Sequence, residues 1–249
     1  MKTSDLVNYC NERLNVASME DYDSAFNGLQ VQNSGTIKRI AASVDASLET
    51  IQKAVELNVQ LLIAHHGLFW GKPLPITKNN YEKYKLLIEH DIAVYACHLP
   101  LDAHPEIGNN AQIAKLLGLQ NTRSEFEFHG NKIGIIGELT SDRIDFKTQL
   151  LEHFPKLIPL EYGPKTIQNI GICSGGSGGI ISMADTVGVD TVIVGECSQH
   201  HYNVAREHHI NVYICGHYAT ETFGINALGL ELSEKFGLPY QFIATECPL

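Results

Sequence analysis

The sequence predicts an α/β protein made of two βαβ-type lobes that are related by a diverged internal repeat. Three observations support this class. Short aliphatic and β-branched runs alternate with helix-length amphipathic segments along the chain. The order of these segments in the first half occurs again in the second half. Several of the short runs end in histidine, and ligands in open α/β sheets bind beyond the carboxyl ends of the strands.

The first half begins with an amphipathic helix. It is predicted from about Ser4 to Leu14, where apolar residues recur at helical spacing behind Thr3 or Ser4 as the N-cap. The strands and helices predicted after it are Ile40–Val44, Leu48–Leu57, Gln60–Ala64, Tyr81–His90 and Ala93–Cys97. The intervening stretch Gly71–Asn80, which contains Pro73, is a candidate lid because it follows a strand that ends in two histidines.

The second half repeats this order after a polar connection at residues 121–165. The connection contains a predicted strand at Lys132–Ile136 and a predicted helix at Phe146–His153. The elements that follow are Asn169–Cys173, Ile180–Val187, Thr191–Val194, Tyr202–His208, Val212–Cys215 and a last helix from His217 to about Phe236. We divide the single unit 1–249 into approximate lobes 1–120 and 121–249, although the composition common to all α/β halves also produces some of this likeness.

The composition argues against several classes of protein. A net charge of −10 argues against sequence-independent binding to nucleic acid, which relies on lysine and arginine. No stretch reaches the roughly 20 apolar residues of a membrane helix, and the N-terminus lacks the pattern of a signal peptide. The six cysteines form no CxxC pair, so we expect a cytoplasmic protein without disulfides or a thiolate zinc site.

Imidazole and carboxylate groups gather at three predicted strand ends. The residues are His65, His66, His98, Asp102, His217 and Glu221. Because the carboxyl ends of parallel strands share one edge of a sheet, we expect a metal site at these ends, between the two lobes. A set of nitrogen and oxygen ligands without thiolate suits Zn, Mn, Fe, Ni or Co.

The spacing within these groups favours metal ligation. His217 and Glu221 are four residues apart at the start of a predicted helix and therefore share one face. Adjacent residues on a regular strand point to opposite faces, so His65 and His66 fit a strand that has just ended, with each imidazole serving a different metal. A single histidine at a strand end is more often structural. Six convergent histidines and acids at three strand ends are hard to explain as packing, because buried ionisable groups are costly unless paired or metal-bound.

The segment His98–Asp102 is predicted to be a loop that curves over the site. Its two end residues are four apart, but Pro100 biases the preceding Leu99 toward extended backbone.

A glycine-rich segment, Ser174–Gly179, joins a predicted strand to a predicted helix. Exposed backbone N–H groups at the start of a helix bind anions, which suits phosphate. The segment matches neither the P-loop nor the Rossmann fingerprint, so phosphate binding and a flexible tight turn are both open interpretations.

Five motifs, in their order along the chain, resemble those of one family. They are Asn27–Val31, His65–Trp70, His98–Asp102, Gly108–Ala111 and Gly216–Glu221. They look like the Nif-three-like dinuclear metal-binding family, whose members commonly carry the name GTP cyclohydrolase I type 2 or its homologue. The resemblance covers essentially the whole chain.

This resemblance implies a dinuclear centre with two divalent metal ions. The corresponding metal ligands are His65, His66, Asp102, His217 and Glu221. Asp102 would bridge the two ions, and His98, the candidate catalytic acid/base residue, would contact an ion or lie next to its ligands. Tyr218 stands where some relatives have a second histidine. The family also implies a ring-shaped homohexamer with the metal sites facing its interior.

The function expected from the resemblance is a dinuclear-metal-dependent hydrolase similar to GTP cyclohydrolase type 2. Metal-activated water would open the ring of a purine nucleotide, so the partner is a small-molecule substrate, with no nucleic acid or membrane. Two alternatives stay open. One is hydrolysis of another small substrate, a phosphoester or a cyclic amide, and the other is a metal-binding scaffold or regulatory protein without turnover.

Overall fold

A computed structural model describes residues 1–72, 74–128 and 130–248. The chain divides into two compact units. Unit 1 comprises Met1–Leu101 and Gly224–Glu246, and unit 2 comprises Asp102–Phe223 with the residues after Glu246. The division differs from a single cut near residue 120, because the chain returns to unit 1 in the middle of its last long helix. The predicted α/β class is confirmed, since each unit contains its own sheet with helices.

The sheet of unit 1 is mainly parallel. In spatial order its strands are β1 (Gly28–Val31), β4 (Ala93–Ala96), β3 (Leu61–His66), β2 (Ile40–Asp45) and β11 (Tyr240–Phe242). Strand β1 is antiparallel to β4, and the other neighbours are parallel. Strands β2 and β4 lie on either side of β3, so the carboxyl ends of all three share one edge of the sheet.

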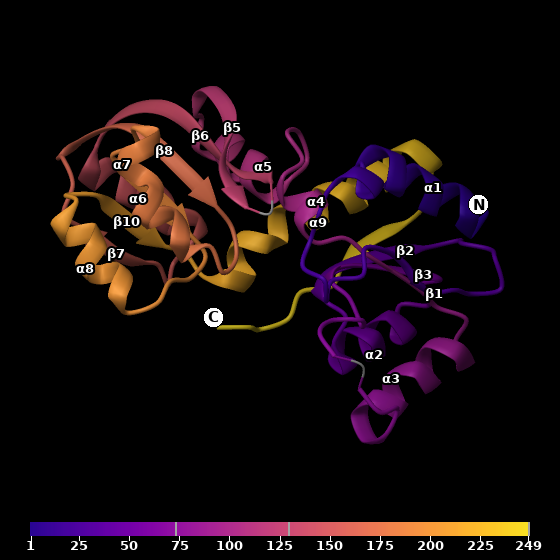
Figure 1. Ribbon diagram of the computed structural model, residues 1–249. Coiled ribbons are helices and arrows are strands. Elements are labelled where there is room, and N and C mark those ends of the chain that lie inside the picture. The colour runs from indigo at the N-terminus through magenta and orange to yellow at the C-terminus, as the bar shows by residue number, and fades with distance from the viewer. Residues whose placement is uncertain (73, 129, 249) are drawn as a thin grey trace. The chain divides into compact units, whose positions relative to one another are not determined.

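Helices cover both faces of this sheet (Figure 1). Helices α2 (Leu48–Glu56) and α3 (Lys78–Glu89) lie on one side, and α1 (Thr3–Arg13) lies on the other with the end of α9 (His217–Phe236). The buried residues beneath α2 and α3 include aliphatic side chains of β2, β3 and β4. A hydrogen bond connects helix α1 to α9: Tyr9 Oη donates to Glu231 at 2.6 Å.

The sheet of unit 2 combines a parallel centre with antiparallel edges. Its spatial order is β5 (Gln120–Phe128), β6 (Asn131–Asp142), β8 (Thr166–Cys173), β9 (Thr191–Val194), β10 (Asn211–Ile214) and β7 (Ile158–Glu161). Strands β8, β9 and β10 are parallel. The helical elements are α4 (Leu99–Asp102), α5 (Asn109–Leu117), α6 (Arg143–His153), η2 (Gly178–Met183), α7 (Ala184–Val187), α8 (His200–Glu207) and the start of α9.

The two units share a strand topology, which supports the predicted internal repeat. In the described part of each unit, an antiparallel strand precedes three consecutive parallel strands in the chain and pairs with the third of them. This is β1 with β4 in unit 1 and β7 with β10 in unit 2. Pairing of Leu61 with Ala93 corresponds to pairing of Thr191 with Asn211. The same alignment makes Glu196, just after β9, the counterpart of His66.

The local structure differs from the sequence prediction in several places. The predicted loop at His98–Asp102 is wrong: Leu99–Asp102 forms the helical turn α4, and Leu101 N–H donates to His98 O at 2.9 Å. Pro100 is tolerated because the first turn of a helix does not use its missing N–H. The predicted helix Ile180–Val187 is a 3-10 turn followed by the short α7.

Two further differences concern the middle of the chain and the segment after β3. The strand predicted at Lys132–Ile136 is the long β6, which pairs with β5 in a ribbon. Helix α3 starts at Lys78, three residues before the predicted helix Tyr81–His90 and inside the candidate lid Gly71–Asn80. Pro73 of that stretch lies outside the described residues, and its lid role stays a prediction.

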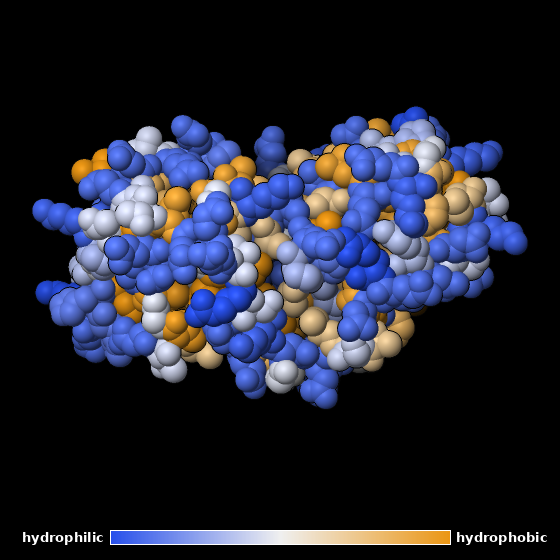
Figure 2. Space-filling model, turned by 90° about the horizontal axis from the view of Figure 1, so that it is seen from above, coloured by the Kyte–Doolittle hydropathy of each residue, from blue (hydrophilic) through white to orange (hydrophobic). Residues whose placement is uncertain are grey.

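The surface of the protein is largely hydrophilic on the face that Figure 2 shows, with apolar residues in small separate areas. This agrees with the net charge of −10. Among the described residues, no helix combines the length and the apolar character that crossing a membrane requires.

Candidate metal centre

Unit 1 brings His65, His66 and His98 together at the carboxyl ends of β3 and β4. One ring nitrogen of each lies within 4.8 Å of the corresponding nitrogens of the other two. The ring centroid of His65 lies 4.8 Å from that of His66 and 5.1 Å from that of His98. Because β3 and β4 are parallel neighbours, their ends deliver these residues to one place. The structure therefore gathers three of the residues that the sequence singled out.

The rings of His65 and His66 are held through their Nδ1 atoms. Nδ1 of the buried His65 lies 2.9 Å from the carbonyl oxygen of Cys97, at the end of β4. Nδ1 of His66 lies 3.0 Å from Oδ1 of Asp45. Asp45 is paired with His66 in the register of β2 and β3, so the sheet itself places this carboxylate beside the ring.

His98 is held by Asp21, which comes from the loop before β1. Asp21 Oδ1 lies 2.8 Å from His98 Nδ1, and Asp21 Oδ2 accepts hydrogen bonds from Leu99 N–H and from Asn27 Nδ2. Asn27 Oδ1 in turn accepts from His98 N–H at 2.8 Å. Two backbone N–H groups at the start of α4 are thus capped by side chains.

The carboxylate of Asp21 stays ionised in this setting. Burial raises the pKa of Asp21, but the hydrogen bond and the positive charge available from His98 outweigh it, so the net shift of the pKa is downward. Only 5% of this side chain is exposed, which makes Asp21 an integral part of the site.

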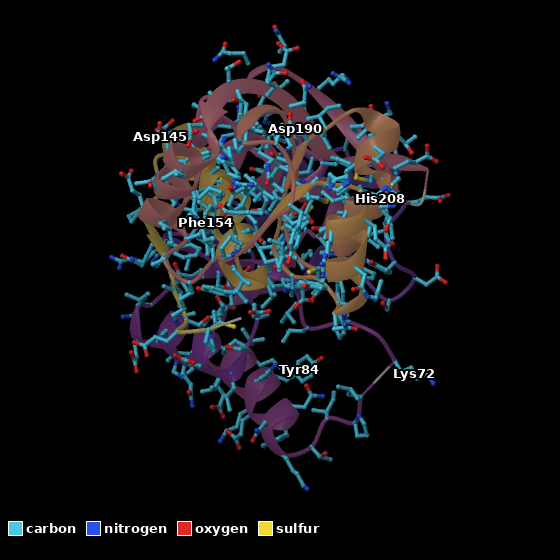
Figure 3. All side chains as sticks on the ribbon, turned by 90° about the vertical axis from the view of Figure 1, so that its left-hand side faces the viewer. Lys72, Tyr84, Asp145, Phe154, Asp190 and His208 are labelled. Carbon is cyan, nitrogen blue, oxygen red and sulfur yellow. The ribbon has the colours of Figure 1, made fainter. Side chains whose placement is uncertain are left out.

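Aromatic side chains border the histidines of unit 1. Trp70 meets His98 edge-on with 4.7 Å between ring centroids, and it lies 5.5 Å from His66. Tyr22 lies 5.8 Å from His98. Phe69 stacks with Tyr84 of α3, which Figure 3 labels. Because Trp70 is the single tryptophan of the chain, its fluorescence reports on this cluster alone.

Gly67 allows close packing behind these rings. A Cβ atom at this position would lie 2.3 Å from Gln30 Nε2 and 2.6 Å from the Ala96 side chain. Gln30 Oε1 accepts from Leu68 N–H at 2.6 Å, so the glutamine is itself fixed. Steric crowding therefore explains why glycine follows the two histidines: a larger residue would clash at this position.

Unit 2 contains His217 and Glu221 in the first turn of α9. His217 Nε2 lies 3.0 Å from Glu221 Oε1, and His217 Nδ1 lies 3.1 Å from Glu196 Oε1. The hydrogen bond with Glu221 raises the pKa of His217 to about 9 against the opposing effect of burial, and Glu196 adds to the rise. The predicted i, i+4 pairing is present in the helix.

Asp102 is buried at the end of α4, with 6% of its surface exposed. Its Oδ1 accepts from Asn109 Nδ2 at 2.8 Å and from Ser174 Oγ at 2.9 Å. These two donors hold the carboxylate in one orientation.

The glycine-rich segment links Asp102 to the start of α9. Ser174 N–H donates to Asn110 Oδ1 at 2.8 Å, and Gly175 N–H donates to Thr220 Oγ1 at 3.0 Å. A Cβ on Gly175 would lie 2.3 Å from Glu221 Oε1, and the φ of Gly175 is +64°. At these two residues the geometry favours the tight turn over phosphate binding, because both N–H groups already serve the protein.

The donor set of the two clusters fits a divalent metal without thiolate. Burial raises the pKa of the nearby Cys173 thiol to about 12, and the charges of Asp102 and Glu221 add to the rise. The thiol therefore stays protonated at neutral pH. Imidazole nitrogens and carboxylate oxygens are the ligands that Zn, Mn, Fe, Ni and Co accept.

The site residues predicted from sequence are divided between the units. His65, His66 and His98 belong to unit 1, and Asp102, His217 and Glu221 belong to unit 2. The chain itself connects the two sets, since the single turn of α4 separates His98 from Asp102.

Sequence reasoning missed the carboxylates that hold the rings, namely Asp21, Asp45 and Glu196. Asp45 and Glu196 follow predicted strands and were therefore detectable by their positions at strand ends. Asp21 lies in a loop, so its position in the sequence does not mark it as a strand-end residue.

The chain is similar over its length to named relatives. A family model described as Duf34/NIF3 (NGG1p interacting factor 3) matches residues 1–248. A Deinococcus radiodurans protein named GTP cyclohydrolase 1 type 2 homolog is 40% identical over 242 residues, which cover 96% of this chain and 91% of that protein. A Pyrococcus horikoshii protein of the same name is 40% identical over 247 residues, 98% of each.

Two solved structures share both fold and sequence with this chain. The protein ybgI, described as of unknown function, has a TM-score of 0.92 at 37% identity, with 100% of both chains covered. A protein from Thermus thermophilus, TTHA1606, has a TM-score of 0.91 at 34% identity with the same coverage. On these matches, the chain belongs to the Duf34/NIF3 (NGG1p interacting factor 3) family.

Proposed function

We propose that this protein is a dinuclear-metal-dependent hydrolase. The proposed metal ligands are His65, His66, Asp102, His217 and Glu221. The observation that carries the proposal is the concentration of imidazoles and buried carboxylates at strand ends, where each unit gathers its own set. Burying such groups is costly unless they are paired or bind metal. The resemblance to dinuclear metal-binding proteins supports the same assignment.

Some side chains of the site are proposed to hold the metal ions, and His98 is proposed to transfer a proton. Two divalent cations held by these ligands would supply Lewis-acid chemistry. Asn109 and Ser174 orient the carboxylate of Asp102, which is proposed to bridge the ions. Asp21 accepts from Nδ1 of His98, so Nε2 is the atom through which His98 exchanges a proton with the substrate.

The proposed substrate is a purine nucleotide, with GTP first. The relatives' name, GTP cyclohydrolase 1 type 2 homolog, supports this choice. The exposed rings of Tyr22, Phe26 and Trp70, which are 42–56% exposed, offer flat faces near His98 to a planar base. A phosphoester or a cyclic amide would use the same metal chemistry.

The test of this function is hydrolysis by the protein loaded with Mn²⁺ or Zn²⁺. We expect slow release of formate from GTP that is abolished by a chelator and by Glu221→Gln. Glu234→Gln, an exposed position on the same helix α9, is the matched control and retains the activity. Metal-loaded protein that binds GTP but yields neither formate nor phosphate over hours would refute the GTP assignment. Hydrolysis of a compound from a panel of phosphoesters would then support the alternative substrate. No hydrolysis of any tested compound would support a metal-binding scaffold.

The protein is also proposed to assemble as a homohexamer, on the basis of the family resemblance. Strand β5 forms an edge of the unit 2 sheet, and most of its side chains are exposed. Unpaired sheet edges are sites where chains associate, and closed symmetric assembly is common among oligomers. Light scattering should give a mass well above 27.5 kDa, near that of a hexamer. A concentration-independent monomer would contradict this expectation.

A further inference from the structure

The four imidazoles of the two clusters share one feature: Nδ1 of each lies within hydrogen-bond distance of an oxygen that can only accept. The pairs are His65 with Cys97 O at 2.9 Å, His66 with Asp45 at 3.0 Å, His98 with Asp21 at 2.8 Å and His217 with Glu196 at 3.1 Å. A carbonyl or an ionised carboxylate has no proton to donate. Nδ1 must therefore carry the proton in every pair, and Nε2 is the nitrogen that each ring offers to a metal.

We propose that Asp45 and Glu196 are positioning residues of the metal centre. Each holds one ligand imidazole, His66 or His217, as the tautomer with hydrogen on Nδ1 and aims Nε2 at the metal. The inference rests on the proposed metal centre and assigns to it two carboxylates outside the set of metal ligands.

The placement of both carboxylates follows from the strands that precede them. Asp45 ends β2 and is the register partner of His66 on the adjacent parallel strand. Glu196 follows β9, and the repeat makes it the counterpart of His66 in unit 2. Each carboxylate therefore stands at a strand carboxyl end, the edge at which α/β sheets bind ligands.

Exposure distinguishes this role from a contribution to folding. Asp45 and Glu196 have side chains that are 45% and 57% exposed. Ion pairs at such positions contribute little to the stability of a fold. Loss of a carboxylate that orients a ligand histidine, in contrast, weakens metal binding by about 10–100-fold. Removing either carboxylate should therefore change metal affinity and leave the melting temperature of the metal-free protein nearly unchanged.

The experiment compares Asp45→Ala and Glu196→Ala with Asp45→Asn and Glu196→Gln in the full chain. Zn²⁺ affinity is measured by competition with a chromophoric chelator, and the ¹⁵N shifts of the metal-free imidazoles report which ring nitrogen carries hydrogen. We expect the alanine variants to bind Zn²⁺ about 10–100-fold more weakly. The amide variants, which keep an oxygen acceptor, should lose less. Asp145→Ala, at an exposed position on α6, is the control and keeps full affinity.

The outcomes separate this inference from the proposed function. If the wild-type protein binds no Zn²⁺, Mn²⁺ or other divalent metal, the metal centre itself fails. If the wild type binds metal and both alanine variants match it, the positioning role is overturned while the metal centre stands. An Nδ1 without hydrogen on His66 or His217 in the metal-free wild type overturns the inference whatever the affinities.

Discussion

Asp102→Asn is expected to lower the bound metal from about two ions per chain to one or none, because a bridging carboxylate neutralises both ions of a dinuclear site. An amide carries no charge and ligates such cations poorly. Its oxygen can still accept from Asn109 and Ser174, so the fold should persist. Metal content is measured by elemental analysis after dialysis, and circular dichroism checks the fold.

Asp145→Asn is the control for this substitution. Asp145 is an exposed aspartate in the first turn of α6, labelled in Figure 3, so its charge should not affect the metal content. Full metal occupancy in the Asp102 variant, with the control behaving as wild type, would exclude the bridging role of Asp102.

Gly175→Ala is expected to weaken metal binding by at least about tenfold. The left-handed backbone of Gly175 costs a residue with a Cβ about 1–2 kcal/mol. The new Cβ would also lie 2.3 Å from Glu221 Oε1, and only 2% of Glu221 is exposed, so this carboxylate has little room to move. The proposed ligand would therefore be displaced. Elemental analysis of the bound metal after dialysis and thermal unfolding measure the two effects.

Gly179→Ala in the same segment provides the matched control. A Cβ on Gly179 meets no described heavy atom within 4 Å, and its φ lies outside the left-handed region. We expect this variant to bind metal like the wild type. Equal metal affinity in both alanine variants would show that the approach of Gly175 to Glu221 has no part in the site.

The sequence by itself determined where most of the regular elements lie. The parallel strands β2, β3, β4, β8, β9 and β10 occur within a few residues of their predicted positions. Helix α9 begins at His217 and ends at Phe236, before Gly237 and Pro239, as predicted. These features depend on local periodicity and on helix-stopping residues, which a single chain displays directly. The strand-end histidines were recognisable because each ends or closely follows an apolar run that local periodicity identifies as a strand.

Only the tertiary structure decided which groups hold those histidines. Asp21 and His98 are 77 positions apart, and Asp45 and His66 are 21 apart, so no local pattern connects them. The pairing of Asp45 with His66 depends on the register of β2 against β3, and that of Asp21 depends on a loop folding back onto α4. The turn of α4 itself was missed because side chains distant in the chain, Asp21 and Asn27, cap its first N–H groups. Such contacts form only when the sheet brings separate segments together, which is why periodicity and spacing could not predict them.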